Sequence, residues 1–403
     1  MTKCDAQKLK HMTRIIQLFT LIFLSAAIYG QGTLVWDFTS GAGVYSSPVV
    51  DDSVLYIGSN DSCLYALDKL NGSLKWKFKT RGEIKSRPLL YNNSVIFNST
   101  DGRVYAVNKH NAQEQWQFVT NGEKRLDMWD YYLSSPVCSN GKVFVGSGDG
   151  HVYALDPNNG QLIWKFQTGD IVHATPLVHN NKVFVGSYSG FFYALNAEKG
   201  DLLWRFRTVG DAYFPKGEIQ KGACIYNNSV IFGSRDYNVY ALNTETGRGL
   251  WNMKEKGSWV IAEPLVVDDL VFFGTSDSHR FCGLSAKNGY EKYSFPLNMR
   301  VYGEAVLHGD AVYFGCFNGK LYQFNRVNEC LEEVFQTHGS KTNYNKVYNE
   351  NDEFKAGFEL YGNDLEESEN KIMNLGAILS TPVIDKGIIY FADANGVVYA
   401  FKL

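Results

Sequence analysis

One sequence pattern recurs along the chain at intervals of about 40 residues. VFVGSGDGHVYALDPNNGQLIWKFQTG begins at Val143, and close variants begin at Val54, Val183 and Val230. A unit of this length cannot bury a hydrophobic face alone, so successive units must stack on one another. The repeat therefore requires a fold built from stacked copies, and the 403 residues are expected to form one array.

Each unit contains four short segments with strand character. In the copy around Val143, the first two segments are separated by Asn140-Gly141 and the next two by Asp149-Gly150. These dipeptides tolerate the positive φ angles that tight antiparallel hairpins require. Four antiparallel strands in about 40 residues are typical of one blade of a β-propeller, so we predict an all-β fold.

Counting the repeats predicts eight blades. The first strands are marked by Pro48, Pro88, Pro136, Pro176, Ala223, Pro264, Ala305 and Pro382. The fourth strands that follow them are marked by Trp76, Trp116, Trp164, Trp204, Trp251, Tyr293 and Phe335. The eighth blade therefore lacks a fourth strand, and TLVWDFTS at residues 33–40 has the matching sequence. We expect this segment, around Trp36, to complete the last blade and close the ring.

Composition and charge exclude several classes of function. The net charge is −3 and no basic patch stands out, so we expect no nucleic-acid partner. Beyond Cys4, the six remaining cysteines are scattered and form no CxxC pair. This argues against a zinc site or a disulfide framework, and we predict no metal centre.

The N-terminus resembles an export signal. Lys8, Lys10 and Arg14 precede the apolar run at residues 15–28, which is short for a membrane span and is followed by small residues. We therefore expect residues 1–30 to be a signal peptide, leaving an exported, periplasmic chain without a transmembrane span. A retained signal anchor is the alternative. No cysteine follows the apolar run, so a lipid anchor is not expected there.

The recurrent V-[FY]-[VI]-G-S-x-D-G-x-[VL]-Y-A-L-D-x-x-x-G-x-x-x-W-x-F resembles the repeat of PQQ-type (quinoprotein-like) propellers across the mature chain. The resemblance implies a single domain over residues 31–403. One branch of this family consists of dehydrogenases that hold PQQ and calcium at the end of the propeller axis. Dehydrogenases of that branch commonly carry a pair of adjacent cysteines, and this chain has no such pair. The other branch is similar to the BamB-type exported eight-bladed scaffolds of outer-membrane protein assembly.

Three insertions interrupt the regular spacing, at residues 121–134, 209–221 and 337–376. All three lie between a fourth strand and the next first strand, so we expect them on one face of the ring, where loops carry binding residues. Candidate partner contacts are Trp129, Tyr131, Tyr132, Tyr213 and Phe214, with local loop packing as the alternative. The acidic third insertion is expected to be mainly a flexible excursion.

Residues just before each first-strand position should line the mouth of the central channel. Among them are Arg87, Glu263 and Glu304, which are candidates for binding a cation or a polar ligand. A hydrated polar funnel is the alternative interpretation. No catalytic triad, nucleophile elbow or metal-ligand spacing is present, so no catalytic residue is predicted.

These observations favour an exported, monomeric, non-catalytic scaffold. It would bind protein or envelope partners through the face that bears the insertions, with outer-membrane protein assembly as a candidate task. It would need no cofactor. The alternative is a PQQ- and calcium-dependent oxidoreductase acting on an alcohol or a sugar, which the family resemblance also permits.

Overall fold

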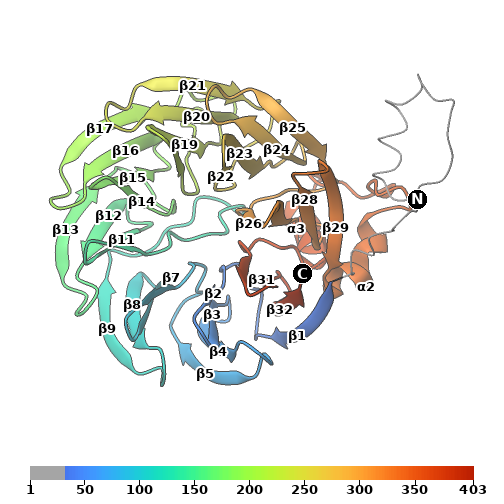
Figure 1. Ribbon diagram of the computed structural model, residues 1–403, viewed down its shortest axis with the longest axis horizontal. Helices are drawn as coiled ribbons and strands as arrows, with labels where there is room; N and C mark the ends of the chain where they lie inside the picture. Colours follow the sequence, from blue (N-terminus) through green and yellow to red (C-terminus); the bar gives the residue numbers. More distant parts are fainter. Residues whose placement is uncertain (1–31) are drawn as a thin grey trace, which may run out of the picture.

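A ring of β-sheets makes up the protein in its computed structural model, which describes residues 32–403. In this part of the chain, 32 strands form eight four-stranded antiparallel sheets, and the sheets follow one another around a central axis (Figure 1). The prediction of an eight-bladed β-propeller is confirmed. Asn140 and Gly141 both have positive φ angles, of 48° and 70°, as the expected hairpin turn requires.

The blades are numbered in chain order, each with its innermost strand first. Blade 1 contains β2 (Val49–Val50), β3 (Val54–Gly58), β4 (Cys63–Asp68) and β5 (Leu74–Lys79). Blade 2 contains β6 (Leu89–Tyr91), β7 (Ser94–Ser99), β8 (Arg103–Asn108) and β9 (Glu114–Val119). Blade 3 contains β10 (Val137–Ser139), β11 (Lys142–Gly146), β12 (His151–Leu155) and β13 (Leu162–Gln167). Blade 4 contains β14 (Leu177–His179), β15 (Lys182–Gly186), β16 (Phe191–Asn196) and β17 (Leu202–Arg207).

The second half of the ring repeats this arrangement. Blade 5 contains β18 (Cys224–Tyr226), β19 (Ser229–Gly233), β20 (Asn238–Asn243) and β21 (Gly249–Lys254). Blade 6 contains β22 (Leu265–Val267), β23 (Leu270–Gly274), β24 (Arg280–Ser285) and β25 (Glu291–Pro296). Blade 7 contains β26 (Val306–His308), β27 (Ala311–Gly315), β28 (Lys320–Asn325) and β29 (Cys330–Gln336). Blade 8 contains β30 (Val383–Asp385), β31 (Ile388–Ala392) and β32 (Val397–Lys402), and β1 (Thr33–Thr39) completes it.

The N-terminal strand closes the ring, as the repeat count predicts. β1 pairs with β32 in an antiparallel register that runs from Thr33 opposite Lys402 to Thr39 opposite Val397. Trp36 lies opposite Ala400 and is buried. β1 is the outermost strand of blade 8, so the closure covers the edge of β32 that would otherwise be unpaired.

The fourth-strand tryptophans seal the junctions between blades. Each indole Nε1 donates a hydrogen bond of 2.9–3.1 Å to a backbone carbonyl of the next blade. The six pairs are Trp36–Lys69, Trp76–Lys109, Trp116–Pro157, Trp164–Ala197, Trp204–Thr244 and Trp251–Ala286. The ring of Trp116 lies on Gly160, where an added Cβ would come within 2.5 Å of the indole. These side chains are therefore packing residues.

Blade 7 departs from this pattern. Glu332, not Phe335, occupies the place of the tryptophans, because β29 pairs Glu332 with Gln323 as β5 pairs Trp76 with Ala66. Phe335 therefore does not mark the tryptophan position, although the sequence suggested it. The reason is topological. In blade 8 the third and fourth strands are β32 and β1, which no turn connects, so an indole from blade 7 would lack the turn it normally packs against.

The third insertion contains two helices and is packed against the ring, which corrects the expectation of a flexible excursion. α2 (His338–Val347) begins at the N-cap Thr337, and α3 (Leu365–Met373) begins at the N-cap Asp364. Val347, Ile372 and other apolar residues of this segment belong to the largest hydrophobic cluster, together with side chains of blades 6 and 7. The free energy gained by burying these apolar side chains outweighs the tendency of the acidic composition to keep the segment unfolded.

Candidate functional site

The residues that precede the first strands stand side by side around the channel. The backbone N–H of Arg87 donates to Ser135 Oγ at 2.9 Å, and that of Ser135 donates to Thr175 Oγ1 at 3.3 Å. On the other side of the ring, Glu304 N–H donates to Thr381 Oγ1 at 3.2 Å. These bonds link equivalent positions of neighbouring blades, so the alignment of the repeats places the channel residues correctly.

The charged side chains of this layer meet in the channel. Arg87 of blade 2 reaches across to Glu304 of blade 7, with 3.9 Å between Nη1 and Oε2. Gly222 leaves room for the Glu263 carboxyl, since a Cβ on this glycine would come within 2.6 Å of it. Lys221 completes the set, and its ammonium lies 3.7 Å from the centroid of the Tyr132 ring. We call Arg87, Lys221, Glu263 and Glu304 the channel cluster.

Burial and mutual repulsion shift the titration of the channel cluster. Burial raises the pKa of the Glu304 carboxyl well above its usual range, and the neighbouring Glu263 adds to this, while Arg87 and Lys221 oppose it. Burial lowers the pKa of Lys221 to about 8, against the attraction of the two carboxylates. Glu304 and Lys221 are therefore expected to gain or lose protons near neutral pH. Groups that titrate in this range occur in polar ligand-binding sites as well as in the active sites of enzymes.

The channel cluster is a poor match for a calcium ion. Ca²⁺ takes six to eight oxygen ligands, whereas here two carboxylates are accompanied by two cationic side chains. Among residues 32–403, no group of three or more His, Cys, Asp or Glu side chains is placed to hold a metal ion. We therefore derive no catalytic step through PQQ or calcium.

The first insertion closes the channel. The chain between β9 and β10 runs across the centre of the ring toward α3 (Figure 1). There the Tyr131 hydroxyl donates to the Glu369 carboxylate of α3, and the Tyr132 hydroxyl donates to the Leu379 carbonyl at 3.1 Å. Tyr131 and Tyr132 are only 3% and 4% exposed. The sequence suggested them as partner contacts, but they fill the channel end and are not available on this surface.

His173 fixes the base of the first insertion. Its Nδ1 lies 2.9 Å from Asp130 and its Nε2 lies 3.3 Å from Glu123, and Tyr188 donates to Asp130 at 2.7 Å. Burial alone would lower the pKa of His173, but the two carboxylates outweigh it and raise the pKa to about 9. The imidazolium is therefore charged at neutral pH and holds the Asp130 and Glu123 carboxylates of the insertion.

The second insertion contacts the first through Arg235 of blade 5. The Arg235 guanidinium binds the Asp127 carboxylate with both Nη atoms, and its Nε donates to Gln220 Oε1 at 3.0 Å. Gln220 in turn donates to the Trp129 carbonyl at 3.1 Å. The bidentate geometry gives a rigid connection between the two loops.

An aromatic cluster joins all three insertions. The ring of Trp259, in the connection between β21 and β22, is contacted edge-on by Trp129, at 5.8 Å between centroids, and by Phe214, at 4.8 Å. Tyr361 of the third insertion lies 6.5 Å from Trp129. The three insertions therefore meet on one face, as their shared position between blades predicts.

Arg300 ties the third insertion to the ring. Its Nη1 lies 3.0 and 2.9 Å from the two oxygens of Glu369, and its Nη2 lies 3.3 Å from the Tyr361 hydroxyl. Arg300 is fully buried, so this ion pair is shielded from solvent. An interaction of this kind requires both partners, since either charge alone would be buried without compensation.

Two aromatic side chains of this face are well exposed, Tyr213, which is one of the candidates from the sequence, and Tyr361, which is not. Tyr213 is 82% exposed and Tyr361 is 52% exposed, whereas Trp129 and Phe214 are half-buried. Together with Val209, which is 74% exposed, Tyr213 and Tyr361 form what we call the insertion face.

The sequence matches a family model described as "Outer membrane protein assembly factor BamB" in three overlapping segments. They cover residues 24–130, 129–251 and 212–328. The chain belongs to this BamB-like propeller family. A comparison with curated proteins gives no match.

Solved structures show the same fold at low sequence identity. BamB from Moraxella catarrhalis superposes with a TM-score of 0.68 at 15% identity, covering 92% of this chain and 100% of that one. The computationally designed protein Ika8 gives a TM-score of 0.68 at 15% identity, with 93% and 100% covered. A quinohemoprotein alcohol dehydrogenase from Pseudomonas putida HK5 gives 0.66 at 13% identity, with 93% and 76% covered. At sequence identities this low, the similarity shows a shared fold only.

Several residues of this BamB-like chain could not be found from its sequence. Lys221, Arg235, Trp259, Arg300 and Glu369 lie far apart along the chain and carry no motif. Arg235 and Trp259 lie in or next to regular repeats, where polar and aromatic residues are common. Arg235 occupies a variable position of the repeat consensus and Trp259 lies beyond its end, so the consensus gave no signal for either.

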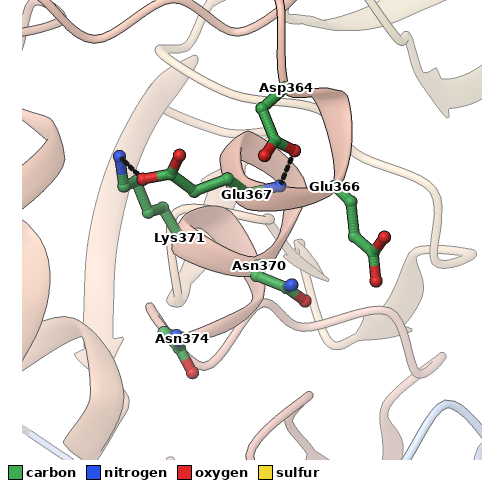
Figure 2. A pocket seen from close by; sticks show the side chains of 6 residues that line it. All are labelled: Asp364, Glu366, Glu367, Asn370, Lys371 and Asn374. Carbon is green, nitrogen blue, oxygen red and sulfur yellow. Dashed lines mark hydrogen bonds and ion pairs between the residues drawn. The ribbon is translucent and has the colours of Figure 1, made fainter.

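The outer surface of α3 carries a shallow pocket that is separate from the insertion face (Figure 2). Asp364 caps the helix by accepting from the Glu367 N–H at 2.8 Å, and Glu367 pairs with Lys371 at 2.7 Å. Asp364 and Glu367 are therefore engaged in contacts that stabilise the helix. Among residues 32–403, no helix has the length and apolarity needed to cross a membrane, and the expected signal peptide lies outside the described residues.

Proposed function

We propose that the chain is an exported, non-catalytic scaffold that binds a protein partner through the insertion face. The observation that carries the proposal is the convergence of three insertions on one side of a rigid ring, with Tyr213 and Tyr361 projecting from it. Large aromatic side chains that are exposed on a rigid support are typical of protein-binding surfaces.

The internal contacts of the insertions support this proposal. Arg235 with Asp127 and Arg300 with Glu369 hold the loops in place, so little conformational entropy would be lost when a partner binds. Membership in the BamB-like family agrees with this role. The family model is named for an outer-membrane protein assembly factor, and we propose a similar task in the cell envelope for this chain.

Site-specific photo-crosslinking tests the insertion face. A photoreactive phenylalanine analogue replaces Tyr213 or Tyr361 in the exported protein, and crosslinking is carried out in intact cells. Tyr290 is the matched control, since it is 75% exposed but lies in a turn between the third and fourth strands, on the opposite face. We expect a discrete crosslinked partner from Tyr213 and Tyr361 and none from Tyr290. Equal products from all three positions would contradict the proposal.

A further inference from the structure

A cleft beside the first insertion is separate from the insertion face. It has a volume of about 190 Å³ and lies between this insertion and the loops of blades 2 and 3. Its charged lining residues are Glu83, Lys85, Glu123, Lys124, Arg125, Asp130 and His173. The volume corresponds to roughly six water molecules of the bulk liquid, so it suits a small molecule or one side chain.

The carboxylates at the base of the cleft are fully engaged. Asp130 accepts from the Leu126 N–H and from Tyr188 and contacts His173, and Glu123 accepts from Ser147 and the Gly148 N–H. These oxygens have little capacity left for a ligand. The base of the cleft therefore offers few acceptors.

The cations of the cleft keep unused donors. Within residues 32–403, the Lys124 ammonium has no hydrogen-bond partner, and Arg125 uses one nitrogen, Nη2, which donates to the Met128 carbonyl at 2.7 Å. Lys85 is 9% exposed and pairs with Glu83 at 2.6 Å, which leaves two of its three protons free. With His173 charged, four cations face three carboxylates, so an excess of donors and of positive charge faces the cleft.

We propose that this cleft binds a carboxylate, held by Arg125 and Lys124 at the rim and by Lys85 at the base. The ligand is a small carboxylic acid or the acidic side chain of a bound peptide, since both present the same group. Charge-assisted hydrogen bonds to two or three cations give the site its affinity, and the cleft volume limits the size of the ligand. The inference does not depend on the insertion face.

Calorimetric titration tests the site with two probes at constant ionic strength, because salt screens such contacts. The probes are succinate and a short peptide with blocked termini and one glutamate, and a glutamine peptide is the control. Saturable binding of succinate alone identifies a free small acid as the ligand. Binding of the glutamate peptide identifies a partner side chain. No saturable binding of either probe would overturn the proposal.

Charge variants separate the cleft from general attraction of anions. The double variant K124Q/R125Q should weaken binding by about tenfold or more, since the loss of even one charged hydrogen bond costs about that much. The control K199Q/R248Q has the same net charge but changes exposed residues of the opposite face, and it should bind as the wild type does. Equal affinity in both double variants would overturn the assignment.

A third variant, E83Q, is expected to bind succinate more tightly than the wild type. Glu83 pairs with Lys85 and competes with a bound carboxylate, and its side chain is 42% exposed, so E83Q should fold normally. Removing this charge should tighten succinate binding several-fold, which loss of folding cannot produce. Weaker binding in E83Q would contradict the proposed role of Lys85.

Discussion

At the scale of single residues, the repeat consensus encodes contacts between neighbouring blades. A tryptophan of one blade packs on a turn of the next, and the turn glycine is required both for its positive φ and for the closeness of the indole. His173 shows another role of a single position, because it lies outside the consensus and holds the first insertion through two carboxylates.

Two glycines with the same φ allow the effect of backbone strain to be separated from the effect of the close contact with the indole. Gly160 and Gly141 both have a φ of 70°, but an added Cβ would lie 2.5 Å from Trp116 at Gly160 and would meet nothing within 4 Å at Gly141. Gly141→Ala should cost about 1 kcal/mol of unfolding free energy, from backbone strain alone. Gly160→Ala should cost more, about 3 kcal/mol, because the indole must also move. Denaturant unfolding measures both, and equal losses would contradict the packing argument.

The ion pairs of His173 predict a pH dependence of stability. The pKa is raised from 6.5 to about 9 on folding, so the contribution is fully present below pH 6.5 and is lost as the pH rises through 9. It amounts to at most about 3 kcal/mol. The difference in unfolding free energy between the wild type and His173→Asn should therefore shrink between pH 6.5 and 10. A difference independent of pH would show that the imidazole is neutral in the folded state.

At the scale of elements, two segments outside the regular repeats pack onto the ring. β1 supplies the last strand of blade 8, and the third insertion folds into α2 and α3 against blades 6 and 7. Both act through contacts with residues far away in sequence. β1 pairs with β32 at the other end of the chain, and Glu369 of α3 binds Arg300.

Removal of β1 should destabilise the whole ring. A chain that begins at Ser40 loses Trp36 and exposes the edge of β32. Burial of one indole contributes several kcal/mol at roughly 25 cal/mol per Å², and the open edge adds a tendency to aggregate. We expect a lower melting temperature and a larger apparent mass in light scattering, relative to a control chain that begins at Gly32. Identical melting of the two chains would contradict the closure.

At the scale of the whole molecule, the ring is a rigid support for one decorated face. All three insertions connect a fourth strand to the next first strand, so antiparallel topology alone places them together. The first insertion then crosses the axis and closes the channel with Tyr131 and Tyr132. This closure separates the channel cluster from the insertion face.

The channel cluster also predicts the outcome of a cofactor titration. PQQ with Ca²⁺ is added to the purified protein while cofactor absorbance and tryptophan fluorescence are followed. Because Arg87 and Lys221 accompany the two carboxylates, we expect no saturable micromolar binding. Saturable binding that is lost in Glu263→Ala or Glu304→Ala would instead support the oxidoreductase alternative.

The sequence by itself determined the blade, the number of blades, the closing strand and the face of the insertions. These follow from local turn chemistry and from a regular period, which act over a few residues and repeat. Only the tertiary structure decided how the insertions fold. It buried Tyr131 and Tyr132, ordered the acidic third insertion and brought Lys221 to Glu263 and Glu304. Such contacts join residues from different blades, and their energies depend on burial that no local pattern encodes.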